Sequence, residues 1–196
     1  MTKSRNIDPK IVDVKQALFT WSNAISFSRI LVVIPIVYLH YTNGYKVTWT
    51  IGVLVFYGII SDYLDGLVAR MTNNISEWGK VLDPVADKFA AFLLFLYAVY
   101  IDRIPLWFFI IEITRDIIIM FGSLYIRKIR GKVAMATMSG KVSVNMLGLY
   151  WIFSFFAPSL TAAHQFLMGA SLALMFFSFF DYLHRFNEIR KGAEFN

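Results

Sequence analysis

Apolar residues occur in six long runs, and short polar connections separate them. The runs cover about residues 24–40, 47–70, 79–100, 105–125, 142–156 and 161–182. Most of them approach the roughly 20 residues that a helix needs to cross the hydrocarbon core of a bilayer. The fifth run is shorter and is expected to extend past Lys141. The pattern predicts an all-α membrane protein with six transmembrane helices.

The first 20 residues differ from the rest because a polar arm leads into a short amphipathic stretch. Apolar residues can form one face of a helix there, with charged residues opposite: Ile11, Val12, Val14, Leu18 and Phe19 against Lys10, Asp13 and Lys15. Such a helix lies along the membrane surface, and a loosely ordered tail is the alternative. We therefore expect three parts: an N-terminal arm and interfacial helix at 1–20, a membrane domain at 21–185 and a cytoplasmic tail at 186–196.

The composition agrees with a membrane protein. Of the 196 residues, 58% are hydrophobic and 16% are charged, and the mean hydropathy is +0.58, which is too apolar for an ordinary soluble domain. The chain has no Cys, which excludes disulfides and thiol chemistry. The net charge of +6 does not predict a nucleic-acid partner. The basic residues lie beside apolar runs and suit anionic lipids and anionic substrates.

Lys and Arg are distributed unevenly between the two sets of connections. One set carries most of them, from Lys3 to Lys191, whereas the other carries only Lys46 and Arg103. The side that is rich in Lys and Arg faces the cytoplasm in membrane proteins. Both termini and the connection at 71–78 are therefore expected in the cytoplasm. We expect an integral protein of a bacterial inner membrane, with its site on the cytoplasmic face.

Four aspartates interrupt the second and third runs at helical spacing. Each helix offers two carboxylates on a stripe of small residues: Asp62, Asp65, Gly66 and Ala69 on one, and Gly79, Asp83 and Asp87 on the other. Helix-end charges are the alternative, but a charge at membrane depth costs roughly 2.5–3.5 kcal/mol. Clustered carboxylates repel one another, and hard divalent cations relieve that repulsion. The pattern indicates two Mg²⁺ or Mn²⁺ ions about 3.5–4 Å apart, with Arg70 suited to a phosphate.

Other polar residues within the apolar runs allow two interpretations each. Arg29 either anchors the first span at the interface or has a structural or substrate-side role. Arg115 either pairs with Glu112 and Asp116 inside the bundle or binds a substrate phosphate. Ser139-Gly140-Lys141 forms either an anion site at a helix start or a positive-inside anchor. Arg185 is either an interface anchor or a ligand.

The aspartate pattern resembles the signature of the CDP-alcohol phosphotransferase family. The match is Asp-x-x-Asp-Gly-x-x-Ala-Arg, then eight residues, then Gly-x-x-x-Asp-x-x-x-Asp, without a substitution. The resemblance implies a CDP-linked lipid donor, CDP-diacylglycerol, and a homodimer. It assigns the metals to Asp62, Asp65, Asp83 and Asp87, and gives Asp87 the role of general base. The remaining matched residues would bind the donor together with Asp65: Gly66, Ala69, Arg70 and Gly79.

The acceptor alcohol depends on fewer positions. Asp83-Pro84-Val85-Ala86-Asp87-Lys88 resembles the form common in phosphatidylglycerophosphate synthases and in cardiolipin synthases of this family. Ser61 and Met138-Ser139 depart from the usual residues of the first group. By this resemblance the acceptor is sn-glycerol 3-phosphate, and four residues are candidates for binding its phosphate: Arg115, Ser139, Lys141 and Arg185.

Two other functions stay open at this point. The first is a related enzyme that uses phosphatidylglycerol, inositol phosphate or serine as acceptor. The second is a non-enzymatic divalent-cation transporter or metal-binding membrane protein. No matching acidic set marks the far side of the membrane, as a through-path for ions would need.

Overall fold

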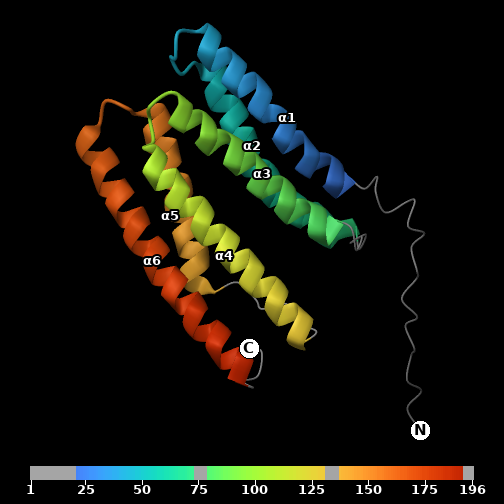
Figure 1. Ribbon diagram of the computed structural model, residues 1–196. Helices are drawn as coiled ribbons and strands as arrows, with labels where there is room; N and C mark the ends of the chain where they lie inside the picture. Colours follow the sequence, from blue (N-terminus) through green and yellow to red (C-terminus); the bar gives the residue numbers. More distant parts are fainter. Residues whose placement is uncertain (1–20, 73–78, 131–136, 192–196) are drawn as a thin grey trace. The chain divides into compact units, whose positions relative to one another are not determined.

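A computed structural model describes the backbone of residues 21–72, 79–130 and 137–191 and the side chains of residues 27–61, 85–129 and 137–191. These ranges contain helices and connections but no strand. The helices are α1 (Trp21–Thr42), α2 (Trp49–Thr72), α3 (Gly79–Tyr100), α4 (Leu106–Arg130), α5 (Met138–Phe156) and α6 (Thr161–Lys191) (Figure 1). Within these ranges the prediction of an all-α fold with six helices is confirmed. The predicted interfacial helix at 1–20 lies outside the described residues.

The chain forms two compact units, Met1–Leu94 and Phe95–Asn196, and α3 runs through the division between them. In the first unit α1 packs against α2. A tight connection reverses the chain, and Gly44 and Tyr45 adopt left-handed backbone angles there, with φ of 65° and 61°. Apolar side chains from both helices fill the space between them: Val33 and Ile36 on α1, and Ile51 and Val55 on α2.

In the second unit α6 packs against both α4 and α5. The centre of this unit is aromatic, because the rings of Phe108 and Tyr150 lie 4.9 Å apart and those of Trp151 and Phe155 stack at 5.0 Å. Small buried serines let the helices approach closely, and the Ser171 hydroxyl reaches the Met146 carbonyl of the facing helix at 3.4 Å. The Phe108 and Tyr150 rings therefore join α4 to α5, and the Ser171 hydrogen bond joins α6 to α5.

Two connections meet at one end of the second unit. The Nε2 atom of His164, near the start of α6, lies 2.8 Å from the carbonyl oxygen of Arg103, which precedes α4. The same ring nitrogen lies 3.3 Å from the Tyr150 hydroxyl. The orientation rule assigned the Arg103 connection and the connection before α6 to one side, and the structure brings these two connections together.

Helix α6 is longer than the predicted run, which ended at Tyr182, and continues to Lys191 through the start of the predicted tail. Its last turns combine apolar packing with local charge: Ile189 is 2% exposed, and the rings of Phe186 and of Tyr125 on α4 lie 5.9 Å apart. His184 and Glu188 lie one turn apart at 3.7 Å, and Arg190 and Lys191 stand where the helix dipole favours cations. Charged residues interrupt the apolar run after Tyr182, but the helix and the packing of Phe186 and Ile189 continue.

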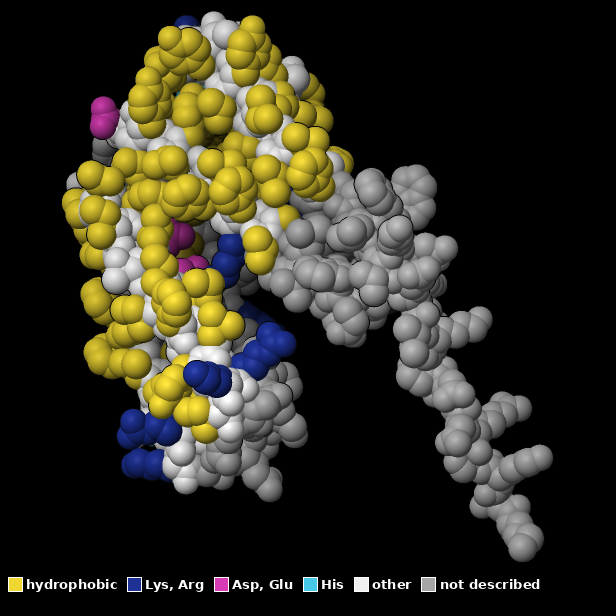
Figure 2. Space-filling model, turned by 45° about the vertical axis from the view of Figure 1, so that its right-hand side comes forward, with side chains coloured by type: hydrophobic (Ala, Val, Ile, Leu, Met, Phe, Trp, Pro, Cys, Tyr) yellow, Lys and Arg dark blue, Asp and Glu magenta, His cyan; other side chains and the backbone are white. Residues whose placement is uncertain are grey.

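Apolar side chains cover much of the described surface on the face that Figure 2 shows. Among the described residues, α6 is the helix that is both long and apolar enough to cross a membrane, and the apolar stretches 27–42 and 49–61 are shorter. Several phenylalanines of α6 face outward, with Phe166 73% and Phe177 65% exposed. An exposed apolar helix of this length is typical of a lipid-facing surface.

Candidate functional site

The aspartate motif lies on two helices, as the spacing predicts. Asp62 and Asp65 belong to α2, and Asp83 and Asp87 belong to α3. Both helices continue through these positions, so each pair lies on one helical face. For most motif positions the structure describes the backbone but not the side chain. These positions are Asp62, Asp65, Gly66, Ala69, Arg70, Gly79 and Asp83. Their roles in binding metal and donor stay predictions.

Asp87 is the motif residue whose surroundings are described, and its carboxylate accepts a hydrogen bond from Arg29 of α1. Arg29 is 7% exposed, whereas the side chain of Asp87 is 37% exposed. Arg29 is therefore buried in an ion pair. The interpretation as an interface anchor would require an extended side chain instead. Arg29 approaches the aspartate that the family resemblance names as general base. The only signal for this contact in the sequence was an arginine inside an apolar run.

Arg115 connects α4 to α6 within the second unit. Its guanidinium donates to the Asp116 carboxylate at 2.9 Å and to the Ser178 hydroxyl of α6. The side chain is buried, and its Nε atom has no hydrogen-bond partner. Of the pairing interpretation, which named Glu112 and Asp116, the contact with Asp116 is observed. Ser178 was missed because nothing in its local sequence marks it. Binding of a substrate phosphate by Arg115 stays a prediction.

The start of α5 carries a second polar cluster. Thr137 caps the helix, since its hydroxyl accepts from the Gly140 backbone N–H at 3.1 Å. Ser139 donates to the carboxylate of Asp181 on α6 and lies 2.9 Å from the Thr137 hydroxyl. Sequence reasoning selected Ser139 but missed Asp181, whose signal was a single carboxylate in the last apolar run. The cluster joins α5 to α6. Two of the predicted phosphate ligands are close to its members in the sequence, since Lys141 follows Ser139 by two residues and Arg185 follows Asp181 by four.

Positive charge gathers at the end of the second unit where α4 and α6 finish and α5 begins (Figures 1 and 2). Lys141 is exposed at the first turn of α5, and Arg185 is half-buried on α6. Arg127, Lys128 and Arg190 are exposed on the last turns of α4 and α6. Cations that are spread over three helix ends attract anions more strongly than any of them alone.

Within the part of the chain whose side chains are described, no group of three or more acidic or histidine side chains could hold a metal ion. Three of the four motif aspartates lie outside that part. The donor set in the sequence nevertheless suits a hard divalent cation, because all four ligands are carboxylates at helical spacing. The two metal ions therefore stay a prediction, and the four carboxylates are suitable ligands for them.

Comparison with known proteins identifies the family to which this chain is similar. The family model described as CDP-alcohol phosphatidyltransferase matches residues 19–177. The chain is 36% identical over 109 residues to a CDP-diacylglycerol–glycerol-3-phosphate 3-phosphatidyltransferase of Aquifex aeolicus, covering 54% of this chain and 59% of that one. It is 34% identical over 82 residues to a Bacillus subtilis protein of the same name, covering 42% of each.

A third relative carries a different name. Over 127 residues the chain is 32% identical to a cardiolipin synthase (CMP-forming)/mitochondrial hydrolase fusion protein of Schizosaccharomyces pombe, covering 65% of this chain and 21% of that one. The chain thus spans between 21% and 59% of the length of these three curated relatives. The family match contains every residue of the aspartate motif.

Proposed function

Since the chain belongs to the CDP-alcohol phosphatidyltransferase family, we propose that it transfers the phosphatidyl group of CDP-diacylglycerol to sn-glycerol 3-phosphate. The products are phosphatidylglycerophosphate and CMP. The observation that carries this proposal is the complete aspartate motif, Asp62 to Asp87, inside the family match. The names of the Aquifex and Bacillus relatives support glycerol 3-phosphate as the acceptor.

Two divalent cations, Mg²⁺ or Mn²⁺, would be held by Asp62, Asp65, Asp83 and Asp87. When bound, they would neutralise negative charge on the diphosphate and make CMP a better leaving group. The remaining motif residues bind the donor: Arg70 pairs with the diphosphate, and Gly66, Ala69 and Gly79 leave room for the nucleotide. The continuity of α2 and α3 through the motif supports this assignment, because it keeps each carboxylate pair on one face.

The proposed reaction is a single displacement. The acceptor hydroxyl attacks the β-phosphorus of CDP-diacylglycerol, its proton passes to the Asp87 carboxylate, and the bond from the β-phosphorus to the CMP oxygen breaks. Arg29 acts on Asp87 as a positioning residue, because it fixes one carboxylate oxygen in the described structure. The absence of Cys agrees with a mechanism that has no thiol nucleophile.

The acceptor phosphate binds at the cationic end of the second unit. Lys141 and Arg185 provide the charge, and Ser139 lies two residues before Lys141 at the start of α5. Arg115 is a weaker candidate, because its guanidinium already donates to Asp116 and Ser178. Its first role is to hold α4 against α6.

We propose that the chain crosses the membrane six times with both termini in the cytoplasm. The exposed apolar side chains support a membrane protein, and the distribution of Lys and Arg supports this orientation. A bacterial inner membrane suits this arrangement, because the nucleotide donor and CMP are then handled on the cytoplasmic side. We further propose that the chain acts as a homodimer, as expected for the family.

A second candidate acceptor is phosphatidylglycerol, which would make the product cardiolipin. The observation that favours it is the 32% identity to the Schizosaccharomyces fusion protein, whose name includes cardiolipin synthase. Family membership favours either enzyme over the metal-transport alternative.

The deciding experiment supplies purified protein in detergent with CDP-diacylglycerol, Mg²⁺ or Mn²⁺, and radiolabelled glycerol 3-phosphate or phosphatidylglycerol in parallel. We expect CMP release and label in phosphatidylglycerophosphate, and loss of both in Asp87→Asn. CMP release with phosphatidylglycerol alone would replace our acceptor with the second candidate. Absence of turnover with either alcohol and either metal ion would overturn the proposal.

The acceptor site is tested by Lys141→Ala, with Arg127→Ala as the matched control. Both residues are exposed cations near the same end of the second unit. We expect Lys141→Ala to raise KM for glycerol 3-phosphate roughly ten-fold, in line with the loss of one charged hydrogen bond, and Arg127→Ala to change it little. Equal effects of the two variants would indicate general attraction of anions rather than a phosphate site.

A further inference from the structure

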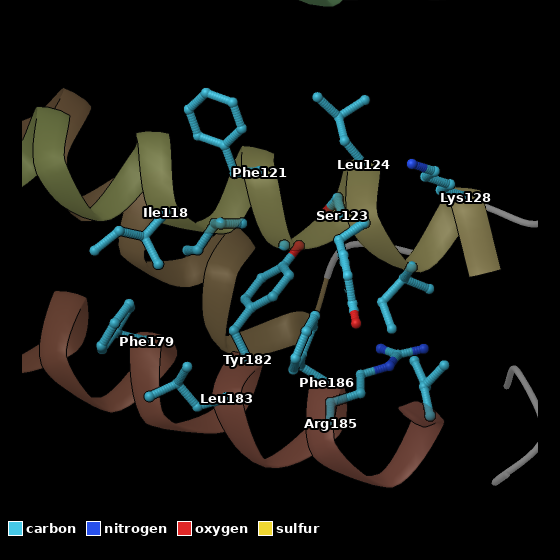
Figure 3. Close-up of a pocket in the computed structure, with 15 residues that line it drawn as sticks. Ile118, Phe121, Ser123, Leu124, Lys128, Phe179, Tyr182, Leu183, Arg185 and Phe186 are labelled. Carbon is cyan, nitrogen blue, oxygen red and sulfur yellow. The ribbon is translucent and has the colours of Figure 1, made fainter. Parts of the chain in front are cut away.

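A long apolar groove with a volume of about 610 Å³ lies between α4 and α6 in the second unit (Figure 3). It is lined from Ile118 to Lys128 on α4 and from Phe179 to Ile189 on α6. At 1.5 Å per residue, each wall is about 15 Å long. The volume falls in the range of roughly 300–1,000 Å³ that is typical of ligand sites. The shape suits one extended hydrocarbon chain.

Gly122 helps to keep the groove open. A Cβ atom at this position would lie 3.7 Å from the Cδ2 atom of Phe186 on the facing helix, which is ordinary contact. An alanine would therefore fit, but a longer side chain would extend into the space between the helices. The surrounding walls are made by aliphatic and aromatic groups, such as Phe121 and Leu183.

Charge is confined to one end of the groove. Figure 3 shows Lys128 and Arg185 at one end and Ile118 and Phe179 at the other. Among the described residues that line the groove, none is acidic. The two acidic groups nearby on α6 already have partners, since Asp181 accepts from Ser139 and Glu188 lies 3.7 Å from His184. The site thus combines an apolar channel with a cationic end.

We propose that this groove binds an anionic phospholipid of the membrane, with one acyl chain between α4 and α6 and the phosphate at Lys128 and Arg185. The complementarity of charge and shape favours this occupant. A free phosphate would leave the apolar walls without a partner, and a neutral lipid would gain less from the two cations. The inference concerns a lipid bound in addition to the CDP-linked donor. Arg185 is shared with the proposed acceptor site, so the test rests on Lys128, which the proposed transfer reaction does not use.

The test is native mass spectrometry of the full-length protein in detergent, titrated with phosphatidylglycerol or phosphatidylcholine of the same acyl chains. We expect phosphatidylglycerol to bind more tightly. Lys128→Gln should weaken its binding roughly five-fold, since one basic residue near an anionic lipid contributes about 1 kcal/mol. Arg127→Gln is the matched control, because Arg127 precedes Lys128 on the same turn and does not line the groove.

A second variant tests the apolar part. Gly122→Leu should weaken binding of both lipids by filling the groove. Gly169→Leu on α6 should not, because no heavy atom lies within 4 Å of a Cβ there and Gly169 does not line the groove. Circular dichroism establishes that each variant remains helical, and Lys128→Gln still tests the site if Gly122→Leu does not fold.

Three results would overturn the inference. The first is equal affinity for the two lipids, which would indicate ordinary annular lipid. The second is an equal loss with Lys128→Gln and Arg127→Gln, which would indicate attraction to the whole cationic end. The third is a dimer that binds no phospholipid but dissociates in Gly122→Leu, which would assign the groove to a second copy of the chain.

Discussion

The ion pair between Arg29 and Asp87 predicts an unequal response to removing either partner. Arg29 is 7% exposed and Asp87 is 37% exposed, so the two charges differ in their access to water. Loss of Asp87 leaves a buried guanidinium without this counter-charge, whereas loss of Arg29 leaves a carboxylate that water can reach. We therefore expect the Asp87 variant to be the less stable one, although both remove the same contact.

The magnitudes follow from burial. Removing one partner of a buried pair costs about 3–5 kcal/mol, so Asp87→Ala should lower the free energy of unfolding by about 3 kcal/mol. Arg29→Met keeps much of the side chain's packing and leaves Asp87 partly hydrated, so the loss should be about 1 kcal/mol, near the value for an exposed pair. For a chain of this length the unfolding midpoints should fall by roughly 6–12 °C and 2–4 °C.

The assay is thermal unfolding in detergent with a chelator present, so that metal binding to Asp87 does not contribute. The double variant completes a thermodynamic cycle, and we expect a coupling energy above about 0.5 kcal/mol. Ser28→Ala is the control, because Ser28 is also on α1 but bonds to the Tyr57 hydroxyl at 2.8 Å instead. A smaller loss in Asp87→Ala than in Arg29→Met, or additive losses, would refute the reasoning.

Three further predictions concern packing and orientation. Thr137→Ala should lower the free energy of unfolding by about 1 kcal/mol through loss of the α5 cap, and Thr137→Ser should restore it in the same thermal assay. Ser178→Ala should cost about 1.5–3 kcal/mol, because it removes a partner of the buried Arg115; a loss no larger than that of an exposed serine would contradict the contact. Because the natural chain has no Cys, single cysteines report orientation: Lys46→Cys should react with an impermeant maleimide in intact cells and Lys191→Cys only after lysis, and the reverse pattern would invert the proposed topology.

Among the described residues, the sequence was sufficient to predict the six helices and most of their bounds. Hydrophobic runs are a local property, since each one depends on residues within a few turns of one another. The ends were less accurate, because α4 continues to Arg130 and α6 to Lys191, where charged residues remain helical. The aspartate motif is likewise local: its spacing places each carboxylate pair on one helical face before any packing is known.

The partners of the polar side chains were decided by the tertiary structure. Arg29 and Asp87 are 58 residues apart, Ser139 and Asp181 are 42 apart, and Arg115 and Ser178 are 63 apart. No periodicity in the sequence relates these residues, because each pair joins two helices whose facing sides depend on packing. Ser178 therefore had no distinguishing local signal, and the only signal of Asp181 was a carboxylate inside an apolar run.

The groove between α4 and α6 likewise depends partly on local sequence and partly on tertiary packing. The sequence by itself determined that Lys128 and Arg185 lie near the ends of apolar helices and that Gly122 has no side chain. Only the packing of α4 against α6 decided that these residues line one space of about 610 Å³. The physical reason is that secondary structure and charge depend on neighbouring residues, whereas a cavity exists only where two surfaces from distant parts of the chain meet incompletely.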